Sequence, residues 1–114
     1  MQVEMSFKEK MTPLLTQEEF EALRASPKLN ERPALIYFTA AWCTPCRAFD
    51  WESIGNSLTG YTVYICDVDA NNYTPGYCGV RSIPNFVVLK PGAVVGPKQT
   101  STPSKLIEWL KESA

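Results

Sequence analysis

Histidine is absent from all 114 residues of the chain, and neither sign of charge is in clear excess. The 11 Lys and Arg residues nearly balance the 12 Asp and Glu residues, which gives a formal net charge of −1 at pH 7. The basic residues are scattered, and the pair Lys8 and Lys10 is too small a cluster to bind nucleic acid. The missing histidine also removes the usual partner of cysteine in mixed zinc sites. We therefore expect neither nucleic-acid binding nor a mixed Cys/His metal site.

Long apolar runs are also absent. The longest, near 34–42, is interrupted by Thr39 and is far too short to cross a bilayer, which takes about 20 residues. The N-terminal stretch MQVEMSFKEKM mixes charged and apolar side chains and lacks the pattern of a secretory signal. We therefore expect no membrane contact and a location in the reducing cytoplasm. In that compartment a closely spaced cysteine pair is more often catalytic or metal-binding than a permanent structural disulfide.

The length is that of one domain, with about 45% apolar residues and 20% charged residues, as in ordinary globular proteins. No repeat, low-complexity segment or shift in composition marks a linker between domains. We expect residues 12–114 to form one domain behind a loose N-terminal tail of residues 1–11. We also expect the protein to be a monomer.

Alternating strand and helix patterns predict an α/β fold. Nearly continuous apolar runs at 34–40 and 62–68 are typical of strands that are buried on both faces of a sheet. The full set of expected elements is strands at 13–15, 34–40, 62–68, 86–89 and 93–95, and helices from Thr16 to Ser26, at 47–58, within 70–79 and at 103–110. Strands joined through helices lie parallel, whereas the last two form an antiparallel hairpin. The prediction is a three-layer α/β/α sandwich with a central mixed sheet of four to five strands.

Local signals mark the ends of several elements. Thr16 and Glu19 fit a capping box. In this motif the Thr16 side chain accepts a hydrogen bond from the backbone N–H of Glu19, and the Glu19 side chain reaches back to the backbone N–H of the cap residue. The segment Lys90-Pro-Gly92 predicts a type II turn in the hairpin, because glycine supplies the positive φ of its second central residue. Thr102 is the expected cap of the last helix, and Pro103 needs no N–H partner at its first position.

The segment Trp42-Cys-Thr-Pro-Cys46 follows the first long strand directly and opens a helix. The carboxyl ends of parallel strands are where ligands and chemistry gather, and a helix N-terminus stabilises an anion such as a thiolate. Cys43 is therefore expected to ionise more readily than a free thiol, whose pKa is about 8.5, while Pro45 stiffens the loop. The pattern favours thiol–disulfide exchange, in which an accessible Cys43 attacks a partner's disulfide and a more sheltered Cys46 resolves the mixed disulfide.

Zinc binding and a structural disulfide are the alternatives for this cysteine pair. The other two cysteines, Cys66 and Cys78, are separated by 11 residues, which does not match a second ligand pair. Cys66 lies in a predicted buried strand. Cys78 lies beside Gly79 and is expected to be the more exposed of the two. A regulatory thiol or an intermolecular disulfide at Cys78 is therefore a hypothesis, although unpaired cysteines are more often simply buried.

Two stretches, ALIYFTAAWCTPCR at 34–47 and VRSIP at 80–84 followed by a strand, resemble the two signatures of the thioredoxin family. This resemblance covers nearly the whole chain after the tail. It implies a thiol–disulfide oxidoreductase that reduces disulfide-containing proteins through a redox-active Cys43–Cys46 disulfide and binds no cofactor. It further implies that a flavoenzyme similar to thioredoxin reductase recharges the dithiol from NADPH.

The same resemblance implies roles for residues around the dithiol. Pro84 would follow a cis peptide bond and face the sulfurs, and the backbone of Ile83 would pair with an extended segment of the substrate. The side chains of Trp42, Thr44 and Pro45 would shape the contact surface, with Trp42 partly exposed. The sequence alone would not predict a cis bond before Pro84, since only about 5–6% of X–Pro bonds are cis, so the resemblance carries that expectation.

The chain departs from the family pattern at several positions. Tyr37 stands where the family has a buried Asp six residues before the first cysteine. The other departures are Thr39 for a tryptophan, Ile65 for a lysine, Trp51 for a helix-kinking proline and Thr44 for a glycine. A tyrosine, with a pKa near 10, is a poor base at pH 7. We therefore expect slower deprotonation and attack by Cys46 than in a typical family member.

Two other functions fit the same residues. A glutaredoxin-like enzyme would take its electrons from glutathione, although the flanking Trp42 argues against this interpretation. A thioredoxin-fold binding module would dock to a partner and leave the dithiol secondary. The second alternative predicts that loss of both Cys43 and Cys46 leaves the biological function intact.

Overall fold

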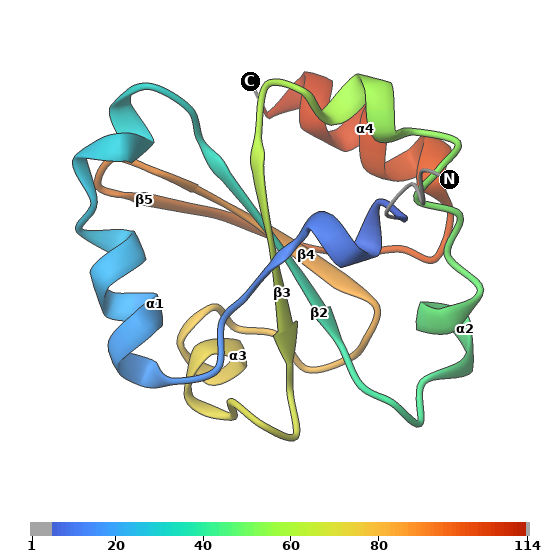
Figure 1. Cartoon of the computed structure of the whole chain (residues 1–114), viewed down its shortest axis with the longest axis horizontal. Helices are drawn as coiled ribbons and strands as arrows, with labels where there is room; N and C mark the ends of the chain where they lie inside the picture. The colour runs from blue at the N-terminus through green and yellow to red at the C-terminus, as the bar shows by residue number, and fades with distance from the viewer. Residues whose placement is uncertain (1–5, 114) are drawn as a thin grey trace, which may run out of the picture.

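The computed structural model describes residues 6–113 and is built around a five-stranded sheet (Figure 1). The strand order is β1-β3-β2-β4-β5, with bounds β1 Thr12–Pro13, β2 Ala34–Thr39, β3 Thr62–Asp67, β4 Asn85–Lys90 and β5 Ala93–Gln99. The pairs β1–β3 and β2–β3 are parallel, whereas β4 is antiparallel to both β2 and β5. The expected mixed sheet with a C-terminal hairpin is therefore confirmed.

Helices cover both faces of the sheet (Figure 1). They are α1 Gln17–Arg24, α2 Thr44–Arg47, α3 Tyr73–Tyr77 and α4 Pro103–Glu112, with 3-10 turns at Lys8–Lys10, Pro27–Asn30 and Gly55–Leu58. One core contains residues of α2 and α4, among them Cys46 and Leu106, and the other contains Phe20 of α1 and lies on the side of α3. The expected α/β/α layering is confirmed.

The central strand β2 is buried along its whole length, as its apolar run predicted. Leu35 and Tyr37 belong to the core on the side of α2 and α4, whereas Ile36 and Phe38 belong to the core on the side of α1. This alternation follows from the two-residue period of a strand. The strand therefore anchors both layers and delivers the chain to the cysteine segment.

The ends of the elements largely follow the expected signals. The Thr16 hydroxyl accepts a hydrogen bond from the Glu19 N–H at 3.1 Å, which confirms half of the capping box. The Glu19 carboxylate accepts from the N–H of Leu15 at 2.6 Å, one residue before the expected partner. Gly92 has a φ of 72°, as the turn requires. The last helix begins at Pro103 after Thr102, as expected.

The helix expected at 47–58 is wrong. Helix α2 ends at Arg47, and the chain returns to a helical turn only at Gly55–Leu58. Phe49 and Trp51 are both buried, yet residues two apart point to different sides of a helix, so burying both requires the chain to leave helical geometry. The Asp50 carboxylate also accepts from the Ser53 N–H at 3.3 Å, a local bond that competes with a helix.

Part of the segment expected as a loose tail packs against the domain. The Phe7 ring stacks on Trp51 with ring centroids 5.5 Å apart, and Met11 is buried. Residues 1–5, the rest of that expected tail, lie outside the described residues. The edge strand expected at 13–15 is found at Thr12–Pro13, and Leu14 continues its pairing through an N–H bond to the Ile65 carbonyl at 2.9 Å.

Candidate functional site

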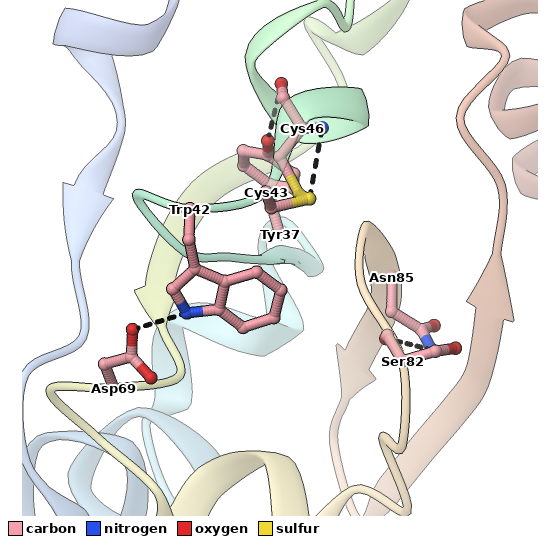
Figure 2. Close-up of a disulfide and its surroundings, with 7 residues drawn as sticks. All are labelled: Tyr37, Trp42, Cys43, Cys46, Asp69, Ser82 and Asn85. Carbon is pink, nitrogen blue, oxygen red and sulfur yellow. Dashed lines mark hydrogen bonds between the residues drawn. A yellow bond between two sulfur atoms is a disulfide. The ribbon is translucent and has the colours of Figure 1, made fainter.

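The two cysteines of the WCTPC segment lie at the start of α2, where β2 ends (Figure 2). Cys43 is the cap residue of α2, and it is joined to Cys46 by a disulfide with the Cα atoms 5.3 Å apart. The backbone N–H of Cys46 donates to the Cys43 Sγ at 3.2 Å. The structure thus confirms the predicted position at a strand-to-helix junction and gives the first sulfur a hydrogen-bond donor.

The two cysteines differ little in accessibility, although Cys43 is the more exposed of the two, as expected. Cys43 is 3% exposed and Cys46 is 1% exposed, so both are buried in the disulfide form. Their neighbours Thr44 and Pro45 are exposed, and Trp42 is 66% exposed, which confirms the expectation for its indole. The surface around the disulfide is therefore formed by its neighbours more than by the sulfurs themselves.

Asp69 is a site residue that sequence reasoning missed. Its carboxylate accepts a hydrogen bond from the Trp42 indole N–H at 2.8 Å, which orients the exposed ring beside the disulfide (Figure 2). Asp69 follows β3, the parallel neighbour of β2, so the ends of both strands meet at the same edge of the sheet. An acidic residue just after β3 was therefore a usable signal.

The peptide bond between Ile83 and Pro84 is cis, as the resemblance implied. In the antiparallel register of β2 and β4, Phe38 pairs with Asn85, so the start of β4 lies beside the end of β2 that leads into the cysteines. Asn85, which was also missed, donates through its amide to the Ser82 carbonyl at 3.2 Å and accepts from the Phe86 N–H at 2.9 Å. The bond to Ser82 braces the loop that carries Ile83 and Pro84 (Figure 2).

A groove of about 440 Å³ lies next to Trp42. Apolar side chains dominate its lining, which includes Trp42, Val68, Pro75, Val80 and Ile83, with Arg81 as a charged member. The groove joins three segments that are distant in sequence, so spacing could not have predicted its full lining. A cavity of similar size, about 460 Å³, lies between Phe7 and Tyr61 and has no cysteine in its lining.

Tyr37 lies on the inner side of the disulfide and is fully buried. Its hydroxyl donates to the Cys46 carbonyl oxygen at 3.1 Å (Figure 2). Burial raises the pKa of this hydroxyl above its ordinary value, because the phenolate would be poorly solvated there. Tyr37 therefore stays protonated near neutral pH and can donate a hydrogen bond but cannot take up a proton.

The remaining cysteines, Cys66 and Cys78, are unpaired and buried on the opposite side of the sheet. Cys78 is the more exposed of the two, as expected, but its exposed fraction is only 5%, against 0% for Cys66, so both thiols are buried. Burial raises the pKa of the Cys78 thiol to about 12. The pKa of the Cys66 thiol is also raised to about 12, mainly by burial and to a smaller extent by the nearby Cys78 and Asp67. Burial argues against the regulatory role that we hypothesised for Cys78.

We expect Cys66 and Cys78 to resist thiol reagents in the folded, oxidised protein. With a thiol pKa of about 12, only about one molecule in 10⁴ carries the thiolate at pH 8, so labelling should be about 10³-fold slower than for free cysteine. The rate should rise with pH, because thiolate accumulates toward pH 12. Ellman's reagent should count two thiols in denaturant, and one in a Cys78→Ser variant. Rapid labelling of either thiol without denaturant would contradict the burial.

Other kinds of site are not seen in the described part of the chain. Within residues 6–113, no three His, Cys, Asp or Glu side chains come together in a way that could hold a metal ion. Over the same residues, no helix has the length and apolar character needed to span a membrane.

Comparison with known proteins agrees with this geometry. The family model described as Thioredoxin matches residues 11–112. The chain is 38% identical over 85 residues to a thioredoxin of Rhodospirillum rubrum, covering 71% of this chain and 82% of the relative. It is 38% identical over 94 residues to a thioredoxin of Bacillus subtilis, covering 76% and 84%. The oxidised mitochondrial thioredoxin 3 of Saccharomyces cerevisiae superposes with a TM-score of 0.80 at 26% identity, covering 94% of this chain and 99% of that one. The chain therefore belongs to the thioredoxin family of thiol–disulfide oxidoreductases.

Proposed function

We propose that this oxidoreductase reduces disulfide bonds in other proteins, with Cys43 as the nucleophile and Cys46 as the resolving thiol. The observation that carries this assignment is the hydrogen bond from the Cys46 N–H to the Cys43 Sγ at 3.2 Å. A donor aimed at this sulfur favours its thiolate form, which is the attacking species. The Cys46 residue is held at a different point, because its backbone carbonyl accepts a hydrogen bond from the Tyr37 hydroxyl.

The proposed cycle has two exchange steps. The Cys43 thiolate attacks one sulfur of the substrate disulfide, and the other sulfur leaves as a thiolate and takes a proton from water. The Cys46 thiol then releases its proton to water and attacks the Cys43 Sγ. The Cys43–Cys46 bond forms as the bond between Cys43 and the substrate breaks, and the second substrate sulfur leaves. Two electrons have moved from the dithiol to the substrate.

The groove beside Trp42 is the proposed binding surface for the substrate segment. Its apolar lining and the exposed ring of Trp42 offer contact area, and Thr44 and Pro45 extend this surface toward the disulfide. We propose that an extended segment pairs with the backbone of Ile83, with Pro84 holding the loop at the sulfurs. The partners would be proteins with accessible disulfides in flexible segments.

Recharging of the dithiol needs an external reductant. We propose a flavoenzyme similar to thioredoxin reductase that uses NADPH, as family membership suggests. No bound cofactor enters the cycle, because the two electrons reside in the dithiol. The cytoplasmic location and the monomeric state expected from the sequence remain part of the proposal. The yeast relative named above is mitochondrial, so the fold itself does not decide the compartment.

A coupled assay tests the proposal. NADPH, thioredoxin reductase and insulin are mixed with the protein, and NADPH oxidation is followed. We expect oxidation that depends on this protein, and little when glutathione and glutathione reductase replace the thioredoxin reductase. A second assay uses dithiothreitol as the reductant in place of the reductase. It detects insulin reduction by this protein even if the thioredoxin reductase does not recognise it. No insulin reduction under either condition would contradict the proposal, and preference for glutathione would favour a glutaredoxin-like enzyme.

A further inference from the structure

We propose that Tyr37 is a positioning residue, whose hydroxyl holds the Cys46 carbonyl and thereby keeps the resolving thiol aligned with the Cys43 Sγ. This inference rests on the proposed role of Cys46 as the resolving thiol. The hydroxyl-to-carbonyl distance of 3.1 Å joins two residues nine positions apart, one on β2 and one on α2. The bond therefore ties residues 43–46, which we call the cysteine turn, to the sheet (Figure 2).

The cysteine turn needs such a tie because α2 is short. The helix has only four residues, and its i to i+4 bonds are those from the Arg47 N–H to the Cys43 carbonyl and from the Ala48 N–H to the Thr44 carbonyl, at 3.2 and 3.1 Å. A longer helix would hold its first turn through the bonds of the turns that follow. Here the chain leaves the helix after Arg47, so Tyr37 supplies an anchor from outside α2.

The Tyr37 ring is itself held in place by its neighbours. Tyr37 pairs with Phe86 across β2 and β4, and the rings stack with centroids 5.5 Å apart. Trp51 meets the same ring edge-on at 4.9 Å and is covered in turn by Phe7, which stacks on it at 5.5 Å. A ring packed on several sides loses little further freedom when its hydroxyl bonds a carbonyl, so the hydroxyl position is fixed before catalysis.

Geometry, and not proton transfer, is the role that these surroundings allow. The phenol stays protonated near neutral pH, and its aromatic neighbours Phe49, Trp51 and Phe86 do not titrate. In the resolving step the Cys46 proton goes to water, the Cys43–Cys46 bond forms, and the substrate sulfur leaves with the electron pair of its bond to Cys43. Tyr37 contributes to this step by keeping the attacking sulfur in line.

The Tyr37→Phe variant tests this role, because it removes one hydroxyl and keeps the ring. The reduced protein is mixed with excess Ellman's reagent in a stopped-flow instrument. Attack by Cys43 releases one coloured thiolate, and resolution by Cys46 releases a second. We expect the second phase to slow by about three- to tenfold, the range for loss of one hydrogen bond, while the first phase is unchanged. Between pH 6 and 9 the factor should be constant.

The controls separate positioning from other roles. Tyr61→Phe removes the hydroxyl of a half-buried tyrosine that has no hydrogen bond to the cysteine turn, and it should change neither phase. An unchanged second phase in Tyr37→Phe would overturn the inference, and so would equal slowing of both phases, which would indicate general loosening of the fold. If the pH profile of the second phase changed shape in Tyr37→Phe, the role of Tyr37 would be proton transfer and not positioning. Loss of the first phase in the unmodified protein would instead contradict the proposed role of Cys43.

Discussion

The Cys43→Ser variant is expected to lose disulfide reduction, with a rate lower by on the order of 10³-fold or more, as when a catalytic nucleophile is removed. A serine hydroxyl is almost entirely protonated at neutral pH, so no thiolate remains to start the exchange. The substitution is nearly isosteric at a buried position, and the fold should survive. Insulin reduction with dithiothreitol, relative to the unassisted rate, measures the effect.

The companion variants make this result specific. Cys46→Ser should attack substrates normally but stall, so that a mixed disulfide at Cys43 accumulates and is seen by non-reducing electrophoresis and mass spectrometry. Cys78→Ser changes a buried thiol away from the site and should keep full activity. If Cys43→Ser retained substantial activity, the proposed nucleophile would be wrong. If the variant lacking both Cys43 and Cys46 kept the biological function in cells, a binding role for the fold would be favoured.

The Phe86→Ala variant is expected to lower the free energy of unfolding by about 3–5 kcal/mol, the usual range for removal of a buried aromatic side chain. Phe86 is fully buried, and its ring lies 5.4 Å from that of Phe49 and 5.9 Å from that of Trp51, in addition to its stacking on Tyr37. Such a loss is a large part of the 5–15 kcal/mol typical of a small domain. Urea unfolding of the oxidised protein, followed by circular dichroism, measures it.

The matched control is Leu15→Ala, because Leu15 is 53% exposed and its removal leaves no cavity. We expect that variant to change the free energy of unfolding by less than about 0.5–1 kcal/mol. A loss below about 1 kcal/mol in Phe86→Ala would mean that the aromatic cluster under the disulfide can collapse to fill the space. The proposed rigidity of Tyr37 would then lose its support as well.

Patterns with a clear physical period were enough to predict most of the sheet. The apolar runs that became β2 and β3 and the Lys90-Pro-Gly92 turn specify local geometry, so neighbouring residues suffice to identify them. The cysteine segment was equally local, because its position between a strand and a helix is visible in the sequence. The cis bond before Pro84 came from the family resemblance and not from the residues alone.

The features that the sequence did not predict all depend on tertiary packing. The end of α2 is set by burial of Phe49 and Trp51 under the sheet, and the helical propensity of that stretch gave no sign of it. The burial of Cys78 likewise depends on how α3 packs against the sheet. Asp69 and Asn85 become site residues only because neighbouring strands bring their ends together. The Tyr37 hydroxyl bonds a backbone carbonyl, and because every residue has one, the sequence could not identify this partner.

The strand order has a consequence for aggregation. The two edges of the sheet are β1 and β5, and each contains a proline, Pro13 in β1 and Pro97 in β5. A proline lacks the N–H that a further strand would need, and the short β1 offers little backbone to pair with. Lys98 places a charge next to Pro97 on the longer edge. Both edges therefore resist strand addition from another chain, which disfavours edge-to-edge aggregation of the protein at high concentration.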